Sequence, residues 1–159
     1  MSSSQHEYFL AKAVELSADC LKSLKGGPFG ALIVKNGEVI ATGVNEVLGN
    51  NDPTAHAEVQ AIRAASSKLN NFDLAGCVIY SSCEPCPMCL AAIYWARIDA
   101  IYFANSRRDA ALIGFDDDFL YHELQKPIEQ RKIPTYKLAI PEAKAIFTTW
   151  STSEQKQLY

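Results

Sequence analysis

Residues 77–97 read CVIYSSCEPCPMCLAAIYWAR, and they join a strand pattern directly to a helix pattern. The run 77–82 is short, apolar and rich in β-branched and aromatic residues, which predicts a buried strand. The stretch 86–97 predicts a helix, because Pro85 and Pro87 stand at its start, where proline is tolerated. A strand that leads straight into a helix is typical of an α/β sheet protein.

The same alternation continues on both sides of this segment. Asn36-Gly37 lies between two β-rich runs in FGALIVKNGEVIATG (29–43), which is a strong hairpin signal. Apolar spacing, capping residues and β-rich runs predict helices over 5–24, 55–68, 118–125 and 141–159, and further strands over 100–105 and 136–140. The pattern predicts one α/β sandwich domain over 1–159, with five strands that are partly parallel.

Composition narrows the class of protein. The chain has 159 residues, of which 48% are hydrophobic, and a net charge of −3 with a pI near 5.6. Nucleic-acid-binding domains are usually basic, so no nucleic acid partner is expected, and the pair Arg107 and Arg108 is interpreted as a solvated loop. The chain has neither a signal-peptide pattern nor a run of 18 apolar residues, so we expect no membrane association and a cytoplasmic location.

Cysteine usage points to chemistry rather than to disulfides. Five cysteines are an odd number, and three of them fall within 83–89, which is a poor pattern for a secreted disulfide framework. Cys86 and Cys89 are separated by two residues at a predicted helix start, and His56 stands at another, in TAHAEV (54–59). One His and two Cys leave the fourth tetrahedral position open to water, the arrangement of catalytic zinc. We therefore predict one Zn²⁺ per chain.

Other interpretations of these cysteines remain open at this stage. Cys83 is a candidate fourth ligand, and its participation would make a closed structural zinc site. An iron-sulfur cluster would need a fourth cysteine, and the position where that run would continue is Ile93. A redox pair is suggested by Cys86 and Cys89 alone, but it leaves the histidine motif unexplained.

Glu58 favours the catalytic interpretation. It lies two residues after His56, and such residues point to different sides of a regular helix. Both can share a site only at the N-terminal end of the helix, where the sequence places them. A carboxylate beside a zinc-activated water can accept its proton and return it to the substrate. Glu58 is therefore the predicted proton shuttle.

The pair of motifs His56-Ala57-Glu58 and Pro85-Cys86-Pro87-Met88-Cys89 resembles the H-x-E and P-C-x-x-C signature of zinc deaminases. On these residues the chain resembles the cytidine deaminase-like superfamily over nearly its whole length. The resemblance implies a three-layer α/β/α sandwich around a mixed five-stranded sheet. It also implies a reaction in which oxygen replaces an amino group on a nucleobase-like ring.

More of the chain resembles the guanine deaminase family within that superfamily. The stretches that carry this resemblance are GGPFGA (26–31), NDPTAHAEV (51–59), SCEPCPMCLAAIYWAR (82–97) and IGFDDDF (113–119), together with a C-terminal aromatic residue. The resemblance implies a small purine as substrate and a homodimer as the assembly. It further implies that the C-terminal segment, about 141–159, completes the active site either in cis or in a partner subunit.

By the same resemblance, five residues serve the purine. Phe29 stacks on the ring, Asn45 hydrogen-bonds its edge and Trp95 closes the pocket. Asp117 holds the ring and helps to move protons, and Tyr159 completes the pocket. Spacing alone does not decide which residue of the acidic run 116–118 faces inward, and the resemblance selects Asp117.

The predicted reaction is hydrolysis of guanine to xanthine and ammonia. A guanosine deaminase or another nucleobase or nucleoside deaminase is the nearest alternative. A transfer RNA adenosine deaminase shares the zinc motifs but would need a more basic surface. A zinc-binding module without enzymatic activity is the alternative from another class.

Overall fold

Strand β1 (Gly30–Lys35) lies at the centre of the fold, flanked by a strand on each side. The computed structural model describes residues 2–158. β1 pairs antiparallel with β2 (Glu38–Val44) and with β3 (Cys77–Cys83), and β3 pairs parallel with β4 (Ala100–Asn105). The sheet is therefore mixed, in the order β2-β1-β3-β4.

The predicted hairpin joins β1 to β2. Asn36 and Gly37 both have positive φ, at 53° and 81°, as a tight two-residue turn between twisted strands requires. Asn and Gly are the residues that adopt this backbone most readily, so the local sequence accounts for the turn.

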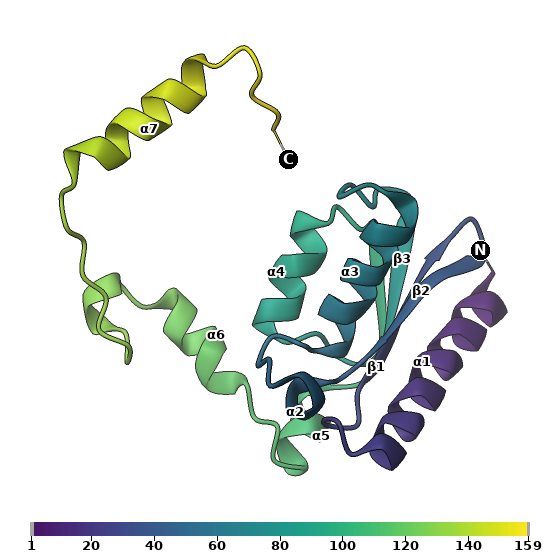
Figure 1. The fold of residues 1–159 in the computed structure, drawn as a ribbon. Coiled ribbons are helices and arrows are strands. Elements are labelled where there is room, and N and C mark those ends of the chain that lie inside the picture. Colours follow the sequence, from purple (N-terminus) through teal and green to yellow (C-terminus); the bar gives the residue numbers. More distant parts are fainter. Residues whose placement is uncertain (1, 159) are drawn as a thin grey trace. The chain divides into compact units, whose positions relative to one another are not determined.

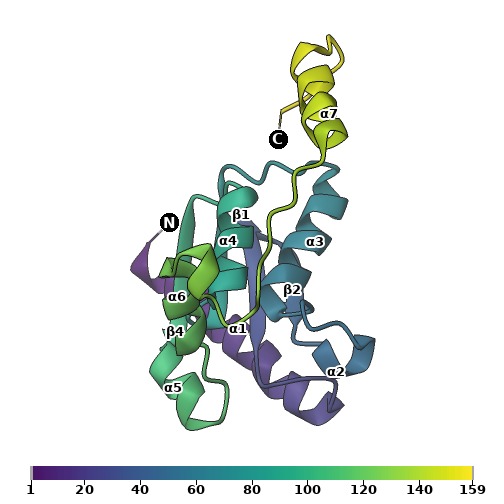
Figure 2. The same cartoon turned by 90° about the vertical axis from the view of Figure 1, so that its left-hand side faces the viewer.

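Helices cover both faces of the sheet, as Figures 1 and 2 show. Helix α1 (Ser3–Ser23) packs on one face against β1 and β3. On the other face, α3 (Ala57–Leu69) packs against β2 and β1, and α4 (Pro87–Trp95) lies beside α3. The predicted three-layer α/β/α arrangement is confirmed.

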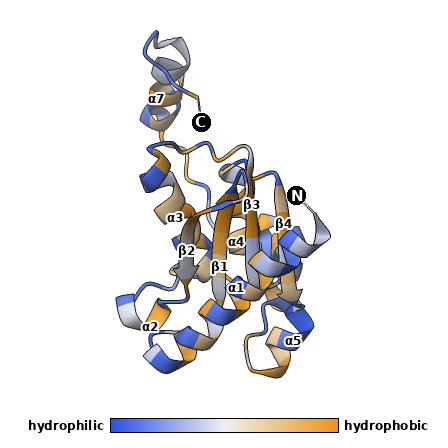
Figure 3. Ribbon diagram, turned by 90° about the vertical axis from the view of Figure 1, so that its right-hand side faces the viewer, coloured by the Kyte–Doolittle hydropathy of each residue, from blue (hydrophilic) through white to orange (hydrophobic). Residues whose placement is uncertain are grey.

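Alternation along β1 supplies a core to each of these faces. Ala31 and Ile33 belong to the buried cluster under α3 and α4, and Leu32 and Val34 belong to the cluster under α1. Because successive side chains of a strand point to opposite faces, an apolar run of this kind is buried on both sides. Figure 3 shows the central strands as the most hydrophobic part of the sheet.

Gly43 brings the end of β2 unusually close to the start of α3. A Cβ at this position would lie 2.2 Å from the carbonyl oxygen of Ala57 and 2.5 Å from the amide nitrogen of Ala61. Both neighbours are backbone atoms of α3, so they cannot move aside as a flexible side chain would. This contact places the residues that follow β2 next to the residues that begin α3.

The prediction of a fifth strand over 136–140 is wrong. The described part of the chain contains four strands, and 136–140 has no regular secondary structure. Its apolar side chains Tyr136, Leu138 and Ile140 are 83%, 80% and 57% exposed. A strand needs the backbone groups of a neighbour, and no described strand pairs with this segment. The apolar alternation of this segment matches a strand pattern, but a local pattern does not supply the neighbouring strand that a strand needs.

Two compact units divide the chain, with the boundary between Tyr121 and His122. The first holds the sheet and its helices. Helix α6 (Asp118–Gln125), at the predicted position, crosses the boundary, and the second unit contains a 3-10 turn, η1 (Ile128–Gln130), and helix α7 (Pro141–Thr152). The last helix was predicted over 141–159, and the observed helix α7 is shorter because it ends at Thr152. No helix among residues 2–158 is long and apolar enough to cross a bilayer.

Two short helices in the first unit were not predicted. They are α2 (Val47–Asn50) and α5 (Arg107–Leu112). Helix α5 begins with a capping box, in which Ser106 accepts from the Asp109 amide and the Asp109 carboxylate accepts from the Ser106 amide. The Ser-x-x-Asp spacing carried this signal in the sequence.

We expect Gly43→Ala to destabilise the protein by about 3 kcal/mol, because the added methyl group overlaps the α3 backbone. Denaturant unfolding measures this change in free energy. Thr42→Ala, an exposed neighbour on the same strand, is the control and should cost about 1 kcal/mol or less. Equal effects of the two substitutions would contradict the close approach.

Candidate metal centre and its cavity

Two helix N-termini carry the predicted metal ligands. His56 is the N-cap of α3 and Cys86 is the N-cap of α4, and Cys89 lies in the first turn of α4. The partial positive charge of helix N-termini stabilises thiolates there. Both N-cap residues have extended backbone, with ψ of 155° and 167°, so their side chains are not tied to the periodicity of the helix that follows.

The three ligand atoms are spaced as zinc requires. The Nδ1 atom of His56 lies 3.6 Å from the Sγ atom of Cys86 and 3.6 Å from that of Cys89. A tetrahedral zinc with ordinary Zn–N and Zn–S bonds would place its nitrogen and sulfur ligands about 3.6 Å apart. All three atoms lie within 4.8 Å of one another, so the donor set fits a zinc ion.

Cys83 does not join this group. Its thiol contacts the carbonyl oxygen of Ser106 at 3.6 Å, and it is absent from the cluster of metal-binding side chains found among residues 2–158. Burial raises the pKa of the Cys83 thiol to about 11, which keeps it protonated at neutral pH. The three-ligand site with an open position is therefore favoured over the closed structural one.

Cys86 is the thiol of this pair that is prepared to carry negative charge. The pKa of Cys86 is lowered to about 4, mainly by a hydrogen bond from Cys89 and to a smaller extent by one from His56. The pKa of Cys89 is raised, because its thiol donates to Cys86 and is buried near Glu58. Hydrogen bonding to Cys86 raises the pKa of His56. A divalent cation held by these three groups would displace the protons that they share.

Glu58 lies beside these ligands, buried in the first turn of α3. The extended backbone at His56 explains how two residues separated by a single position reach one site. Ser81, itself buried on β3, donates its hydroxyl to Glu58 Oε1 at 2.8 Å. Burial raises the pKa of Glu58, so this carboxyl group holds a proton more readily than a solvated one.

Above the ligands opens a cavity of about 430 Å³. It lies wholly within the first unit, where the segments that follow β2, β3 and β4 and the segment that precedes β1 line it. Its walls include Phe29 and Phe115, whose rings meet edge to face with centroids 4.9 Å apart. A Cβ on Gly27 would lie 2.7 Å from the Phe115 ring and 2.9 Å from the Phe29 ring, so glycine makes room for this aromatic pair.

Asn45 lines the cavity, is 4% exposed, and donates its backbone N–H to the carbonyl of Phe29 at 3.1 Å. Its side-chain oxygen accepts the backbone N–H of Val47 at 3.2 Å. A Cβ on Gly26 would lie 2.1 Å from that oxygen, so the amide group packs directly against glycine backbone. With its oxygen engaged, the side chain retains NH₂ donors for another partner.

The acidic run 116–118 contributes to the cavity wall. Asp117 is half-buried and lines the cavity together with the exposed Asp116, whereas Asp118 is exposed and pairs with Arg107 at 3.9 Å. Burial and the nearby Cys86 charge raise the pKa of Asp117, and the Arg107 guanidinium opposes that shift.

The interpretation of Arg107 as part of a solvated loop is wrong. Arg107 opens α5, lines the cavity, and places its guanidinium 4.5 Å from the centroid of the Tyr121 ring. The Glu84 carboxylate accepts its backbone N–H at 3.0 Å. Arg108 is exposed, as expected. The missed signal was the capping sequence at Ser106, which predicts that Arg107 lies at a helix start.

Trp95 is not brought into this cavity. Trp95 ends α4, is 67% exposed and lines a separate shallow depression with Tyr94 and Arg97. Tyr159 lies outside the described residues. The roles inferred for these two residues stay predictions.

Comparison with known proteins identifies the family. Residues 3–105 match the model of the cytidine and deoxycytidylate deaminase zinc-binding region. The chain is 51% identical to guanine deaminase of Bacillus subtilis, over 97% of this chain and 99% of that protein. The chain belongs to the guanine deaminase family of zinc-dependent deaminases. Members of this family are hydrolases acting on C–N bonds in cyclic amidines, and zinc is the cofactor of the site described above.

Solved structures agree with this family assignment. The crystal structure of the Bacillus subtilis guanine deaminase matches with a TM-score of 0.94 and 49% identity, over 100% of this chain and 99% of that one. A guanine deaminase from Nitrosomonas europaea matches with a TM-score of 0.65 and 32% identity, over 69% and 63% of the two chains. The expected mixed α/β fold is thereby confirmed, apart from the fifth strand.

We expect the zinc content of cysteine variants to distinguish the metal ligands from Cys83, which lies outside the ligand cluster. Cys83→Ser should keep about one zinc per chain, because its sulfur faces the Ser106 carbonyl rather than the ligand cluster. Cys86→Ser should lose most of the metal, because it removes one of three ligands. Metal analysis of the purified variants measures both. Zinc loss from Cys83→Ser would show a fourth ligand and a closed site.

Proposed function

We propose that this chain catalyses the hydrolysis of guanine to xanthine and ammonia. The similarity to guanine deaminase extends over 97% of the chain. The similarity to a transfer RNA adenosine deaminase of Aquifex aeolicus, at 42% identity, covers 62% of it. The guanine deaminase match therefore includes part of the chain that the transfer RNA enzyme does not share. This difference in coverage carries the choice of substrate.

The cavity suits a flat, uncharged heterocycle. Phe29 offers an aromatic surface for stacking, and the Asn45 amide can donate to an acceptor on the purine edge. Carboxylates on the lining come from Glu58, Glu84, Asp116 and Asp117, against one guanidinium from Arg107. Excess negative charge disfavours a phosphodiester, which supports a small purine rather than nucleic acid as the partner.

Proton transfer in the reaction falls to Glu58. Zinc at His56, Cys86 and Cys89 would supply activation of water at neutral pH. Glu58 accepts one proton from the attacking water and delivers it to a ring nitrogen as oxygen adds at carbon 2. It then takes the second proton from the hydroxyl group on carbon 2 and passes it to the amine, which leaves as ammonia while the carbon 2 carbonyl forms. Its buried carboxyl group with a raised pKa is suited to hold a proton between these steps. Ser81 fixes the orientation of that carboxyl group through its 2.8 Å hydrogen bond.

Asp117 is proposed to hold the purine and assist its proton transfers. It is the half-buried member of its acidic run and faces the same cavity as Glu58. Its raised pKa permits it to alternate between donor and acceptor at the substrate edge.

The assembly proposed is a cytoplasmic homodimer in which the C-terminal segment of one chain completes the site. Support comes from exposed apolar groups on both units. In the second unit Ile146, Phe147 and Trp150 of α7 are 66%, 79% and 49% exposed, and in the first unit Tyr94 and Trp95 are exposed on α4. Apolar surface of this extent usually marks an interface. Trp95 and Tyr159 would then act on the purine in the assembled protein.

We expect zinc-loaded protein to convert guanine to xanthine with release of ammonia. Glu58→Ala should reduce kcat by at least about a thousandfold, because it removes the main group that moves protons. Parallel assays with guanosine, cytosine, cytidine and adenine distinguish the alternative deaminases. Full activity in Glu58→Ala would overturn the mechanism. A preference for guanosine would show that guanosine, rather than guanine, is the substrate.

Mixing two inactive chains tests where the C-terminal segment acts. One chain carries Glu58→Ala, and the other lacks residues 141–159. If the segment acts in a partner subunit, mixed dimers should regain activity at one of their two sites, because the site with intact Glu58 then receives the C-terminal segment of the Glu58→Ala chain. Activity measured after mixing, with dimer formation followed by sedimentation, decides the matter. No recovery in mixed dimers would place the segment in its own chain's site.

A further inference from the structure

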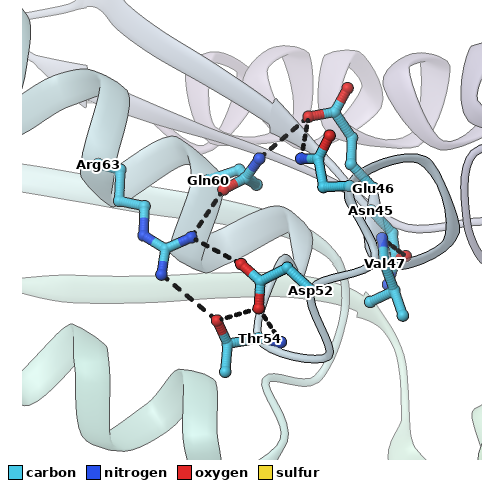
Figure 4. A network of polar contacts seen from close by, with 8 residues as sticks. Asn45, Glu46, Val47, Asp52, Thr54, Gln60 and Arg63 are labelled. Carbon is cyan, nitrogen blue, oxygen red and sulfur yellow. Dashed lines mark hydrogen bonds and ion pairs between the residues drawn. The ribbon is translucent and has the colours of Figure 1, made fainter.

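We propose that Glu46 is a positioning residue that holds Asn45 in the orientation that binds the purine, through a polar network with Gln60 and Arg63 of α3. The inference rests on the proposed function, since that proposal gives Asn45 its contact with the substrate. Figure 4 shows the network, in which side chains of α3 reach across to the loop between β2 and α3.

Glu46 joins three segments of the chain. Its Oε2 atom accepts from Gln60 Nε2 at 3.0 Å and from Asn50 Nδ2 at 3.3 Å, and its Oε1 atom lies 3.8 Å from Lys25 Nζ. Its backbone N–H donates to the carbonyl of Ala55 at 2.9 Å. Glu46 thus ties the residue after Asn45 both to α3 and to the residue before His56.

Arg63 closes the other side of the same loop. Its guanidinium donates to Gln60 Oε1 at 3.1 Å and to Thr54 Oγ1 at 3.3 Å, and lies 3.5 Å from Asp52 Oδ2. The hydroxyl of Thr54 in turn donates to Asp52 at 2.7 Å, and this bond is the main reason that the pKa of Asp52 is lowered. Gln60 therefore links both ends of the loop through its amide group.

The network lies behind the cavity wall rather than in it. Asn45, Val47 and Pro53 line the cavity, whereas Glu46 and Gln60 do not. Lys25 carries the effect to the next wall segment, since its carbonyl accepts the backbone N–H groups of Leu48 and Gly49 at 2.9 Å. Lys25 directly precedes the Gly26 backbone, against which the Asn45 amide packs. A shift of Glu46 would therefore displace Val47 and Gly26, the two residues that the Asn45 side chain contacts.

Stability is a poor explanation for this arrangement. The Glu46 side chain is 28% exposed and that of Arg63 is 55% exposed. Ion pairs at such positions contribute little to folding. The hydrogen bonds do restrict the loop that carries Asn45, and a preorganised binding group is the benefit expected from such restriction.

The test is a kinetic cycle between Glu46→Ala and Asn45→Ala. Glu46→Ala should raise KM about tenfold, the effect of losing charge-assisted hydrogen bonds that orient a binding group, with a smaller change in kcat. Zinc content should stay at the wild-type level. In the Asn45→Ala background, Glu46→Ala should have no further effect on KM, because the group that it positions is gone.

Three further variants complete the experiment. Gln60→Ala removes the helix partner of Glu46 at a position where alanine favours the helix, and it should raise KM in the same way. Glu46→Gln keeps an acceptor oxygen and should restore KM to within about twofold of wild type. Glu38→Ala removes an exposed carboxylate on β2 that lies outside the network, and should leave KM unchanged.

Outcomes separate this inference from the proposed function. The kinetics are followed on whichever aminated heterocycle the wild type deaminates, so a substrate other than guanine changes the proposed function but not the cycle. An unchanged KM in both Glu46→Ala and Gln60→Ala overturns the inference. An equal effect of Glu46→Ala with and without Asn45 also overturns it, because the effect then does not pass through Asn45. A wild type that deaminates no heterocycle overturns both proposals.

Discussion

Two helix N-termini meet at one point, and the 3.6 Å separation of His56 Nδ1 from the Cys86 and Cys89 sulfurs is the constraint on which the structure depends. Each helix contributes residues that are still in extended or first-turn backbone, so side chains from different turns converge. The same field that favours thiolates at these termini opposes the cost of burying them. Glu58 shares the first turn of α3 and is placed by the same geometry.

The sheet holds these helices in place through a few close contacts. Gly43 lets β2 approach the backbone of α3 closely, and Ser81 of β3 donates a hydrogen bond to Glu58. Strand β3 also leads into the cysteine helix through Glu84, whose carboxylate caps Arg107 at the start of α5. Segments that follow β2, β3 and β4 therefore supply parts of the site, which agrees with the tendency of α/β sheets to bind ligands at the carboxyl ends of strands. Antiparallel β1 contributes Phe29 from its amino end.

Local patterns in the sequence were sufficient for the parts of the protein that local physics determines. Turn chemistry at Asn36-Gly37 and the paired ligand motifs placed the hairpin and the metal centre correctly. The strand expected over 136–140 failed because strand formation depends on a distant partner. The capping sequence at Ser106 indicated a helix start at Arg107, but not that Arg107 lines the cavity. Spacing did not decide which residue of 116–118 faces inward, and only the resemblance selected Asp117, because burial of a polar side chain is decided by tertiary packing.

The cavity wall has a consequence for how such enzymes diverge. The metal-binding group and the proposed proton shuttle Glu58 lie in α3, in α4 or at their N-caps. The cavity-lining residues Phe29, Asn45 and Asp117 lie on separate connections between elements. Loops tolerate substitution and insertion better than the scaffold that carries them. A lineage can therefore exchange one ring for another by altering short connections, while the water-activating machinery is inherited intact. Chemistry and substrate choice are, in this fold, separately heritable.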